Sequence, residues 1–293
     1  GQADGNIAIG LSAMLGAAGT TGNSNIAIGT TVMDALTTGA CNVAIGTNAL
    51  GAATTASQNI AIGELALGGG ATTGNRNIAI GKSSGDALVD GSENIGIGSD
   101  AYGTATAGSN NIALGHDALG GALVTGNNII AIGNAAADAV TGGECTIAIG
   151  RNAYGTAAAG GFNVAIGDTA MGGTLVTGIN NVAIGTNAGD AMLGANCNVA
   201  IGYAAIGAGT TPGNAVAIGQ CAMGTGVVTG SGSVGIGCKA LTAVTSGGKN
   251  VAIGCGAGAS VTTTGCTINI GQGADQTTAG VTCFAGVCVM AAQ

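Results

Sequence analysis

Aliphatic residues recur along this chain in a five-residue pattern of the form Asn-Ile-Ala-Ile-Gly, which is found sixteen times. After a longer first step, the closing glycines follow one another at intervals of 17, 17 and 18 along the sequence, and this order repeats to give a 52-residue super-repeat. The residue before the glycine is Ile except at Leu114, and the residue three before it is Ile or Val. The closing glycines are Gly10, Gly29, Gly46, Gly63, Gly81, Gly98, Gly115, Gly133, Gly150, Gly167, Gly185, Gly202, Gly219, Gly237, Gly254 and Gly271.

The pattern predicts a short β-strand in every period. Successive side chains of a strand point to opposite faces, so Ile7 and Ile9 share one face while Ala8 and Gly10 share the other. Ile and Val suit a pleated surface, and this period is too short for the helical pairs of repeat proteins, which need about 34 residues. We therefore expect an all-β fold, a parallel β-solenoid (β-roll) of about sixteen 17–18-residue coils. It would occupy residues 1–275, with 276–293 as a C-terminal tail or inter-subunit segment.

Two polar features accompany the strands. A glycine seven residues before the closing glycine recurs in eleven coils, where we expect a turn with positive φ. Asparagine opens the pattern in eleven coils, where it would form an amide ladder or simply tolerate the turn-to-strand dihedrals; the two interpretations are compatible. These asparagines are Asn6, Asn25, Asn42, Asn59, Asn77, Asn94, Asn111, Asn163, Asn181, Asn198 and Asn250.

The second face of the strands carries alanine, except at Gly96, Gly235 and Asn269. Strands that are apolar on both faces are usually covered on both, so we expect this ladder to pack against another sheet of the same coil or a second chain. No capping helix precedes the first pattern, so the solenoid ends are expected to be uncapped and to template another subunit. The predicted assembly ladder consists of Ala8, Ala27, Ala44, Ala61, Ala79, Ala113, Ala131, Ala148, Ala165, Ala183, Ala200, Ala217 and Ala252.

Composition narrows the function classes. Glycine supplies 61 of 293 residues, charged residues make up 6% and aromatic residues 2%, there is one proline, and the net charge is −8. One proline excludes collagen, and so few cations exclude a phosphate-binding track. No apolar run is long enough for a transmembrane helix. The only histidine, His116, lacks the companion motif of a hydrolase, so we expect it in a structural or surface role and predict no catalytic residue, cofactor or metal.

The nine cysteines follow the repeat. Cys238 and Cys255 each follow a closing glycine in adjacent coils, and Cys266 and Cys283 are separated by the same interval. Same-phase residues on neighbouring rungs lie about 4.8 Å apart, within disulfide range, so we predict that at least one pair is oxidised, as suits an extracellular protein. Three further cysteines recur at multiples of the super-repeat and would pair with other chains or stay buried: Cys41, Cys145 and Cys197. Four aspartates stand five residues after a closing glycine and are expected to be solvated turn carboxylates: Asp34, Asp86, Asp138 and Asp190.

Coils such as Asn25-Ile26-Ala27-Ile28-Gly29 and the run from Thr72 to Gly81 resemble the head repeats of trimeric autotransporter adhesins. They also resemble repeats of phage tail-fibre-like proteins that carry a C-terminal endosialidase-type chaperone. The segment from Cys266 to Gly273, leading into Thr282 to Val287, looks like the stretch before that chaperone, which is absent here. The resemblance implies a left-handed β-roll, often trimeric, that serves as a stalk or adhesive head; it brings no catalytic residues.

These features favour a non-enzymatic structural subunit of an extracellular fibre or appendage, on a cell surface or a virion. It would assemble through its Ala/Gly and Ile/Val ladders and its uncapped ends. The alternative is an adhesive or receptor-binding head or stalk of a trimeric fibre, and a minor alternative is an ice-binding protein. Expected partners are copies of the chain, as a homotrimer or an end-to-end polymer, with a cell-surface or glycan ligand in the adhesive case.

Overall fold

The computed structural model of the protein describes residues 4–15, 21–121, 123–156, 159–173, 175–209, 211–277, 281–284 and 287–290, the last two segments by their backbone. The chain forms two compact units, Gly1–Cys145 and Thr146–Gln293. Each unit is a parallel β-solenoid, so the predicted fold class is confirmed. Among the described residues, no helix has the length and hydropathy that crossing a membrane requires.

Every repeat of the pattern forms one three-residue strand. In the first unit the strands are β1 (Ile7–Ile9), β2 (Ile26–Ile28), β3 (Val43–Ile45), β4 (Ile60–Ile62), β5 (Ile78–Ile80), β6 (Ile95–Ile97), β7 (Ile112–Leu114) and β8 (Ile130–Ile132). In the second they are β9 (Ile147–Ile149), β10 (Val164–Ile166), β11 (Val182–Ile184), β12 (Val199–Ile201), β13 (Val216–Ile218), β14 (Val234–Ile236), β15 (Val251–Ile253) and β16 (Ile268–Ile270), followed by β17 (Val281–Phe284) and β18 (Val287–Met290).

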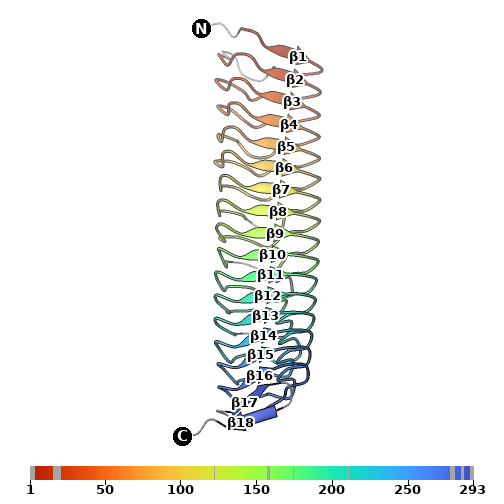
Figure 1. Ribbon diagram of the computed structural model, residues 1–293. Coiled ribbons are helices and arrows are strands. Elements are labelled where there is room, and N and C mark those ends of the chain that lie inside the picture. The colour runs from red at the N-terminus through yellow and green to blue at the C-terminus, as the bar shows by residue number, and fades with distance from the viewer. Residues whose placement is uncertain are drawn as a thin grey trace. The chain divides into compact units, whose positions relative to one another are not determined.

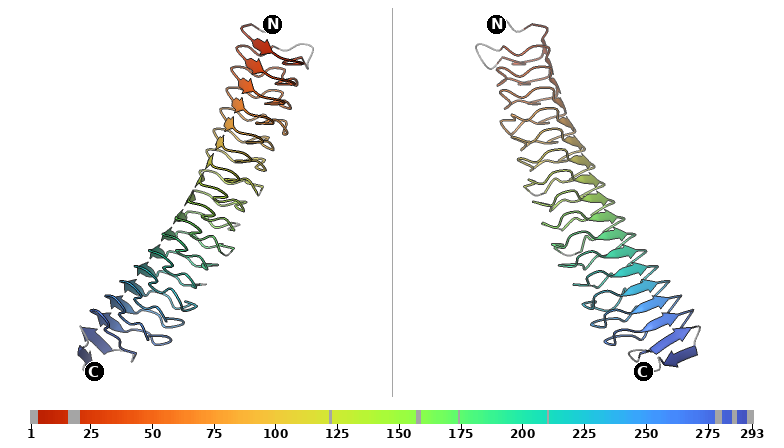
Figure 2. Two further views of the ribbon diagram at one scale, coloured as in Figure 1. Left: turned by 90° about the vertical axis from the view of Figure 1, so that its right-hand side faces the viewer. Right: turned by 60° about the vertical axis from the view of Figure 1, so that its left-hand side comes forward.

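Within each unit the strands stack in register. Ala44 of β3 lies opposite Ala61 of β4, and the flanking aliphatic residues are paired in the same way. Figures 1 and 2 show that the strands of a unit share one side of the coils, while turns form the opposite side. The regular period therefore brings chemically equivalent residues together on neighbouring rungs.

The closing glycine is required by its surroundings. At Gly46 φ is 128°, and a Cβ atom there would lie 2.5 Å from the carbonyl oxygen of Gly63 in the next coil. Any side chain would push the two coils apart. This explains why the position holds glycine in all sixteen patterns.

Each coil also bends at residues that are not glycine. Asn48, Leu50 and Gln58 have φ of 55°, 52° and 59°, a left-handed conformation that costs about 1–2 kcal/mol per residue. Each donates its backbone N–H to a neighbouring coil: to Thr30 at 2.9 Å, Ala66 at 2.9 Å and Ala40 at 2.9 Å. Stacking therefore offsets the cost of these bends.

The alanines of the strands point into the coil. Of the thirteen alanines predicted as an assembly ladder, all but Ala8 are buried within the chain itself. Large side chains from the turns, such as Met33, Leu50 and Tyr102, are buried as well, and Ala79, Leu67 and Tyr102 line the same small cavity. Of the two alternatives for what covers this ladder, cover by the same coil is the one found, although turns rather than a second sheet provide it. The other alternative, that the ladder packs against a second chain, is wrong.

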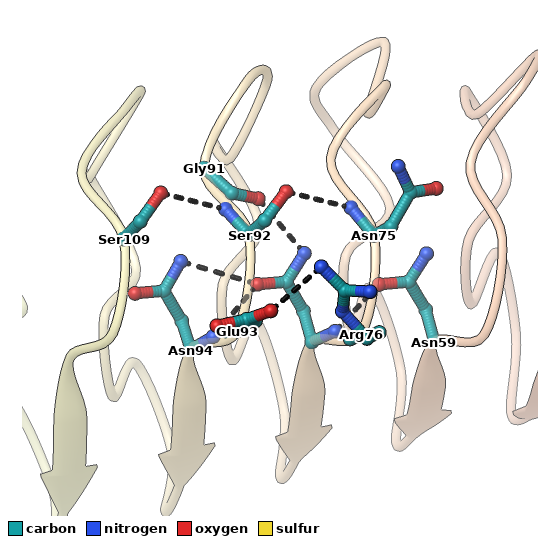
Figure 3. Close-up of polar contacts among 9 residues, drawn as sticks. Asn59, Asn75, Arg76, Gly91, Ser92, Glu93, Asn94 and Ser109 are labelled. Atoms are coloured by element: carbon teal, nitrogen blue, oxygen red, sulfur yellow. Dashed lines mark hydrogen bonds and ion pairs between the residues drawn. The ribbon is translucent and has the colours of Figure 1, made fainter.

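The asparagines form the predicted amide ladder (Figure 3). The backbone N–H of Asn77 donates to Oδ1 of Asn59 at 2.8 Å, and its Nδ2 donates to the carbonyl of Gly91 at 2.9 Å. Its Oδ1 in turn accepts from the backbone N–H of Asn94 at 3.0 Å. The side chain is buried, so Asn77 satisfies two backbone groups of the following coil, one N–H and one carbonyl, that water cannot reach.

Glycine is found at the turn position, seven residues before the closing glycine, for a different reason from the one expected. Gly74, whose carbonyl accepts from Asn59 Nδ2, does not have the predicted positive φ. A Cβ atom at Gly74 would instead collide with the carbonyl oxygen of Gly91. Close approach of successive coils, rather than a left-handed turn, selects glycine at this position, and Gly108 is a turn glycine that does have a positive φ, of 85°.

The segment predicted as a tail continues the ladder. β17 pairs in parallel with β16, and β18 pairs antiparallel with β17. The buried side chain of Asn269 anchors the start of this segment, because its Oδ1 accepts from the backbone N–H of Gln276 at 2.7 Å. Cys283 lies opposite Asn269 rather than Cys266. The predicted alignment of Cys266 with Cys283 is therefore wrong, since the regular period ends after β16.

Candidate functional site

The outer face of the strands carries two rows of aliphatic side chains, which we call the Ile/Val face. It comprises the first and third residues of β1–β8 in one unit and of β9–β16 in the other, and all of them are Ile, Val or Leu. These residues are half-buried or exposed, whereas the alanine between them is buried from β2 onward. Ile97 is 40% exposed and Ile253 is 40% exposed. Large side chains thus face outward and small ones inward.

No charged residue interrupts the Ile/Val face, because the ionic groups lie at the turns. Arg76 and Glu93, which directly precede the ladder asparagines Asn77 and Asn94, form an ion pair of 2.6 Å between adjacent coils (Figure 3). Arg151 and Asp168 form another pair of 2.6 Å, directly after the closing glycines of their strands. The rows of the Ile/Val face are therefore apolar along their whole described length, with charge confined to the edges.

The predicted cysteine sites whose side chains the structure describes are exposed or half-buried and are not linked, and the side chain of Cys283 lies outside the described part. Cys238 and Cys255 are free thiols, so the disulfide predicted between them is not formed. Cys266 is also a free thiol. Cys41, Cys145 and Cys197 are exposed and free, which contradicts the alternative that they are buried as small hydrophobic residues.

Three of the turn aspartates are not freely solvated as predicted. The carboxylate of Asp86 packs over Gly69 in the preceding coil, where a Cβ atom would lie 2.7 Å from Oδ1. Its Oδ1 is buried, as is Oδ1 of Asp138, which packs in the same way over Gly121. Burial raises the pKa of Asp86, Asp138 and Asp190 above its usual range, against the opposing effect of a backbone N–H hydrogen bond.

His116 lies at the surface, as expected, but it is not isolated. Its Nδ1 is 2.8 Å from Oδ2 of Asp117, and Asp100 from the preceding coil completes a group of three possible ligands. The sequence interpretation missed Asp100, although its position, one period before Asp117, is a usable signal in a chain with this repeat. The described residues hold no second group of three metal-ligating side chains.

No family model, no curated protein and no solved structure matches the chain.

Proposed function

We propose that this protein is a structural subunit of an extracellular fibre or appendage and that copies of it associate through the Ile/Val face. The observation that carries the proposal is the unbroken pair of outward aliphatic rows, which include Ile97 at 40% exposure. Monomeric soluble proteins rarely expose a contiguous apolar patch of more than a few hundred Å². An apolar face of this kind is expected to be buried against another molecule.

A second copy of the chain is the occupant that fits best. It presents the same two rows with the same spacing of about 4.8 Å between rungs, so side chains of one copy fit between those of the other. Each half-exposed Ile or Val that becomes buried contributes about 0.5–1 kcal/mol. Association costs roughly 4–15 kcal/mol, so only rows of many residues can offset it, and each unit supplies eight regularly spaced strands.

The low charge of the chain supports association as a permanent state. With 6% charged residues, little of the surface is strongly hydrated, and few like charges would repel copies from one another. In a closed trimer the face of each copy would lie against another copy, and end-to-end stacking of trimers would give the fibre.

An adhesive head is the second candidate, favoured by large apolar side chains that are exposed away from the strands. Phe162, Leu175 and Ile179 of the second unit are 55%, 51% and 44% exposed. Such side chains at turns would contact a receptor while the Ile/Val face holds the copies together. Loss of cell or glycan binding on replacing Phe162 and Leu175 by serine, with assembly intact, would support this role.

The Ile/Val face is tested by placing charge on it. In the variant Ile60→Lys/Ile80→Lys both replaced residues are on the outer rows, so each coil should still close. We expect the native chain to sediment as an oligomer and the variant as a monomer with an unchanged circular dichroism spectrum. Thr47→Lys, at an exposed turn, is the matched control and should assemble normally. A native chain that is monomeric at all concentrations would refute the proposal.

A further inference from the structure

Three side chains from two adjacent coils meet at one turn edge of the first unit. Asp100 lies three residues after the end of β6, and His116 and Asp117 lie two and three residues after the end of β7. Each offers one ligand atom, and the three atoms lie within 4.8 Å of one another. The side chains of His116 and Asp117 are 57% and 40% exposed, so an ion in solution can reach them.

The repeat itself creates this group. Asp100 and Asp117 occupy the same position of their coils, and both have φ of 55°, a left-handed conformation that aspartate tolerates better than most residues. The backbone N–H of Asp117 donates to the carbonyl of Ser99 at 3.1 Å, which fixes the two coils relative to each other. The hydroxyl of Ser99 donates to Oδ2 of Asp100 at 2.7 Å and orients that carboxylate.

The charge at this edge differs from that at the other charged turns. At three other places an acid faces a base one coil away: Glu64 lies 3.8 Å from Lys82, and the pairs Arg76–Glu93 and Arg151–Asp168 are each 2.6 Å.

Asp100 and Asp117 instead place two acids on adjacent coils. The only ion pair that the described residues form with either of them is His116–Asp117. The neighbouring coils add Asp86 and Asp138, and the pKa of each is raised further by the negative charge of Asp100 and Asp117 respectively. A cation would relieve this repulsion.

We propose that Asp100, His116 and Asp117 bind a divalent transition-metal ion of the Zn²⁺ type, with water completing its coordination. Imidazole nitrogen together with carboxylate oxygen favours Zn²⁺, Co²⁺ or Ni²⁺, whereas Ca²⁺ and Mg²⁺ prefer oxygen alone. Ligand atoms around tetrahedral Zn²⁺ are separated by about 3.4 Å, given bonds of about 2.0–2.2 Å. Exposed side chains reach that spacing from the present one by small rotations, and the ion then clamps one coil to the next.

The single histidine of the chain makes the test specific. Diethyl pyrocarbonate acylates a free imidazole nitrogen, and the resulting change in ultraviolet absorbance reports on His116 alone, even in a large assembly. The cysteines are first alkylated, because those described are free thiols that would also bind Zn²⁺. We expect equimolar Zn²⁺ to slow the acylation of His116 at least fivefold and the same concentration of Ca²⁺ to leave the rate unchanged.

Two variants separate a three-ligand site from a lone imidazole. Asp100→Asn and Asp117→Asn keep a residue that tolerates the left-handed backbone, and each should lose most of the protection by Zn²⁺ when its own rates with and without the ion are compared. Asp168→Asn, which removes an exposed turn carboxylate of the second unit, should keep full protection. Absence of protection in the native chain, or equal protection in Asp100→Asn, would overturn the proposal. Matching thermal unfolding curves would show that the variants are folded.

Discussion

The two faces of each strand differ in the size and the burial of their side chains. In β4, Ala61 points inward and is completely buried, whereas Ile60 and Ile62 point outward and are half-buried. In an ordinary two-layer fold the large residues face the core and the small or polar ones face solvent. The reversal here shows that the coil closes on itself through small residues, and that its outer aliphatic rows stay partly exposed.

The interior is small because the opposite wall already fills it. Buried residues of the turns, such as Leu67 and Tyr102, reach across to the alanine row. Where Gly96 replaces alanine, Ser84 of the preceding coil donates its hydroxyl to the Gly96 carbonyl at 2.9 Å. The cavity beside Gly85 and Gly96 has a volume of about 10 Å³, enough for no more than one water molecule. The interior therefore accepts only local exchanges of similar volume.

Breaking the inner polar ladder should have the largest effect on the stability of one chain. Asn77→Leu removes the acceptor for the N–H of Asn94 and the donor for the carbonyl of Gly91, both inaccessible to water. Leaving these groups without partners should lower the free energy of unfolding by about 3–5 kcal/mol, measured by denaturant titration.

The control for Asn77→Leu is a substitution in the neighbouring polar row. Asn75→Ser should cost less than about 1 kcal/mol, because Ser92 already occupies the equivalent position of the next coil and accepts a backbone N–H there (Figure 3). Equal losses in the two variants would show that the buried ladder is no more important than the half-buried row.

Enlarging an inner residue should have the next largest effect. Ala61→Leu forces extra volume between β4 and the turn wall, so the free energy of unfolding should fall by about 1–3 kcal/mol. The matched change on the outer face, Ile62→Leu, should alter it by less than about 0.5 kcal/mol. The same loss in both variants would contradict the assignment of inner and outer faces.

The sequence was sufficient to predict the fold, but not to predict which face of each strand points into the coil. The fixed period, the closing glycines and the opening asparagines predicted parallel rungs and an amide ladder. A residue at a given position of the repeat lies next to the same residue type at the equivalent position of the adjacent coil. The pattern Ile-Ala-Ile is apolar on both faces, so it does not say which face is inside. That choice depends on the width of the coil, which is set by turn residues such as Met33 and Leu50 with left-handed φ.

The candidate sites could likewise be predicted only where the regular period continues. Asp100, His116 and Asp117 meet because their coils are in register, and the period alone would have placed the two aspartates together. Cys283 departs from the period because the chain after Asn269 takes a shorter path to β17. No repeat pattern describes that segment, so only the structure reveals its register.

Acid should stabilise the chain through the three half-buried turn aspartates, with a smaller effect. The pKa of Asp86, Asp138 and Asp190 is raised in the folded state, so folding favours their protonated forms. Above the raised pKa their ionised forms destabilise the fold, and this cost disappears as pH falls through it. The melting temperature should therefore rise as the pH is lowered from about 7 to about 4. The rise should be smaller in a variant in which Asp86, Asp138 and Asp190 are all replaced by asparagine. An unchanged rise in that variant would assign the effect to net charge.

Changing an outer residue should have the smallest effect on a single chain and is the sharpest test of the comparison. Ile62→Thr keeps a β-branched side chain and loses only half-buried apolar surface, so in dilute solution the free energy of unfolding should fall by less than about 1 kcal/mol. If copies associate through the Ile/Val face as proposed, the native chain gains stability from its partners at higher concentration, and its melting temperature should rise with protein concentration. That dependence should weaken in Ile62→Thr and weaken further when Ile45 and Ile80 are also replaced by threonine. Ala61→Ser, one residue away on the inner face, should lower the melting temperature at every protein concentration. The change of melting temperature with concentration should stay the same as in the native chain. If instead the inner variant removes the concentration dependence and the outer ones do not, then copies associate through some surface other than the Ile/Val face.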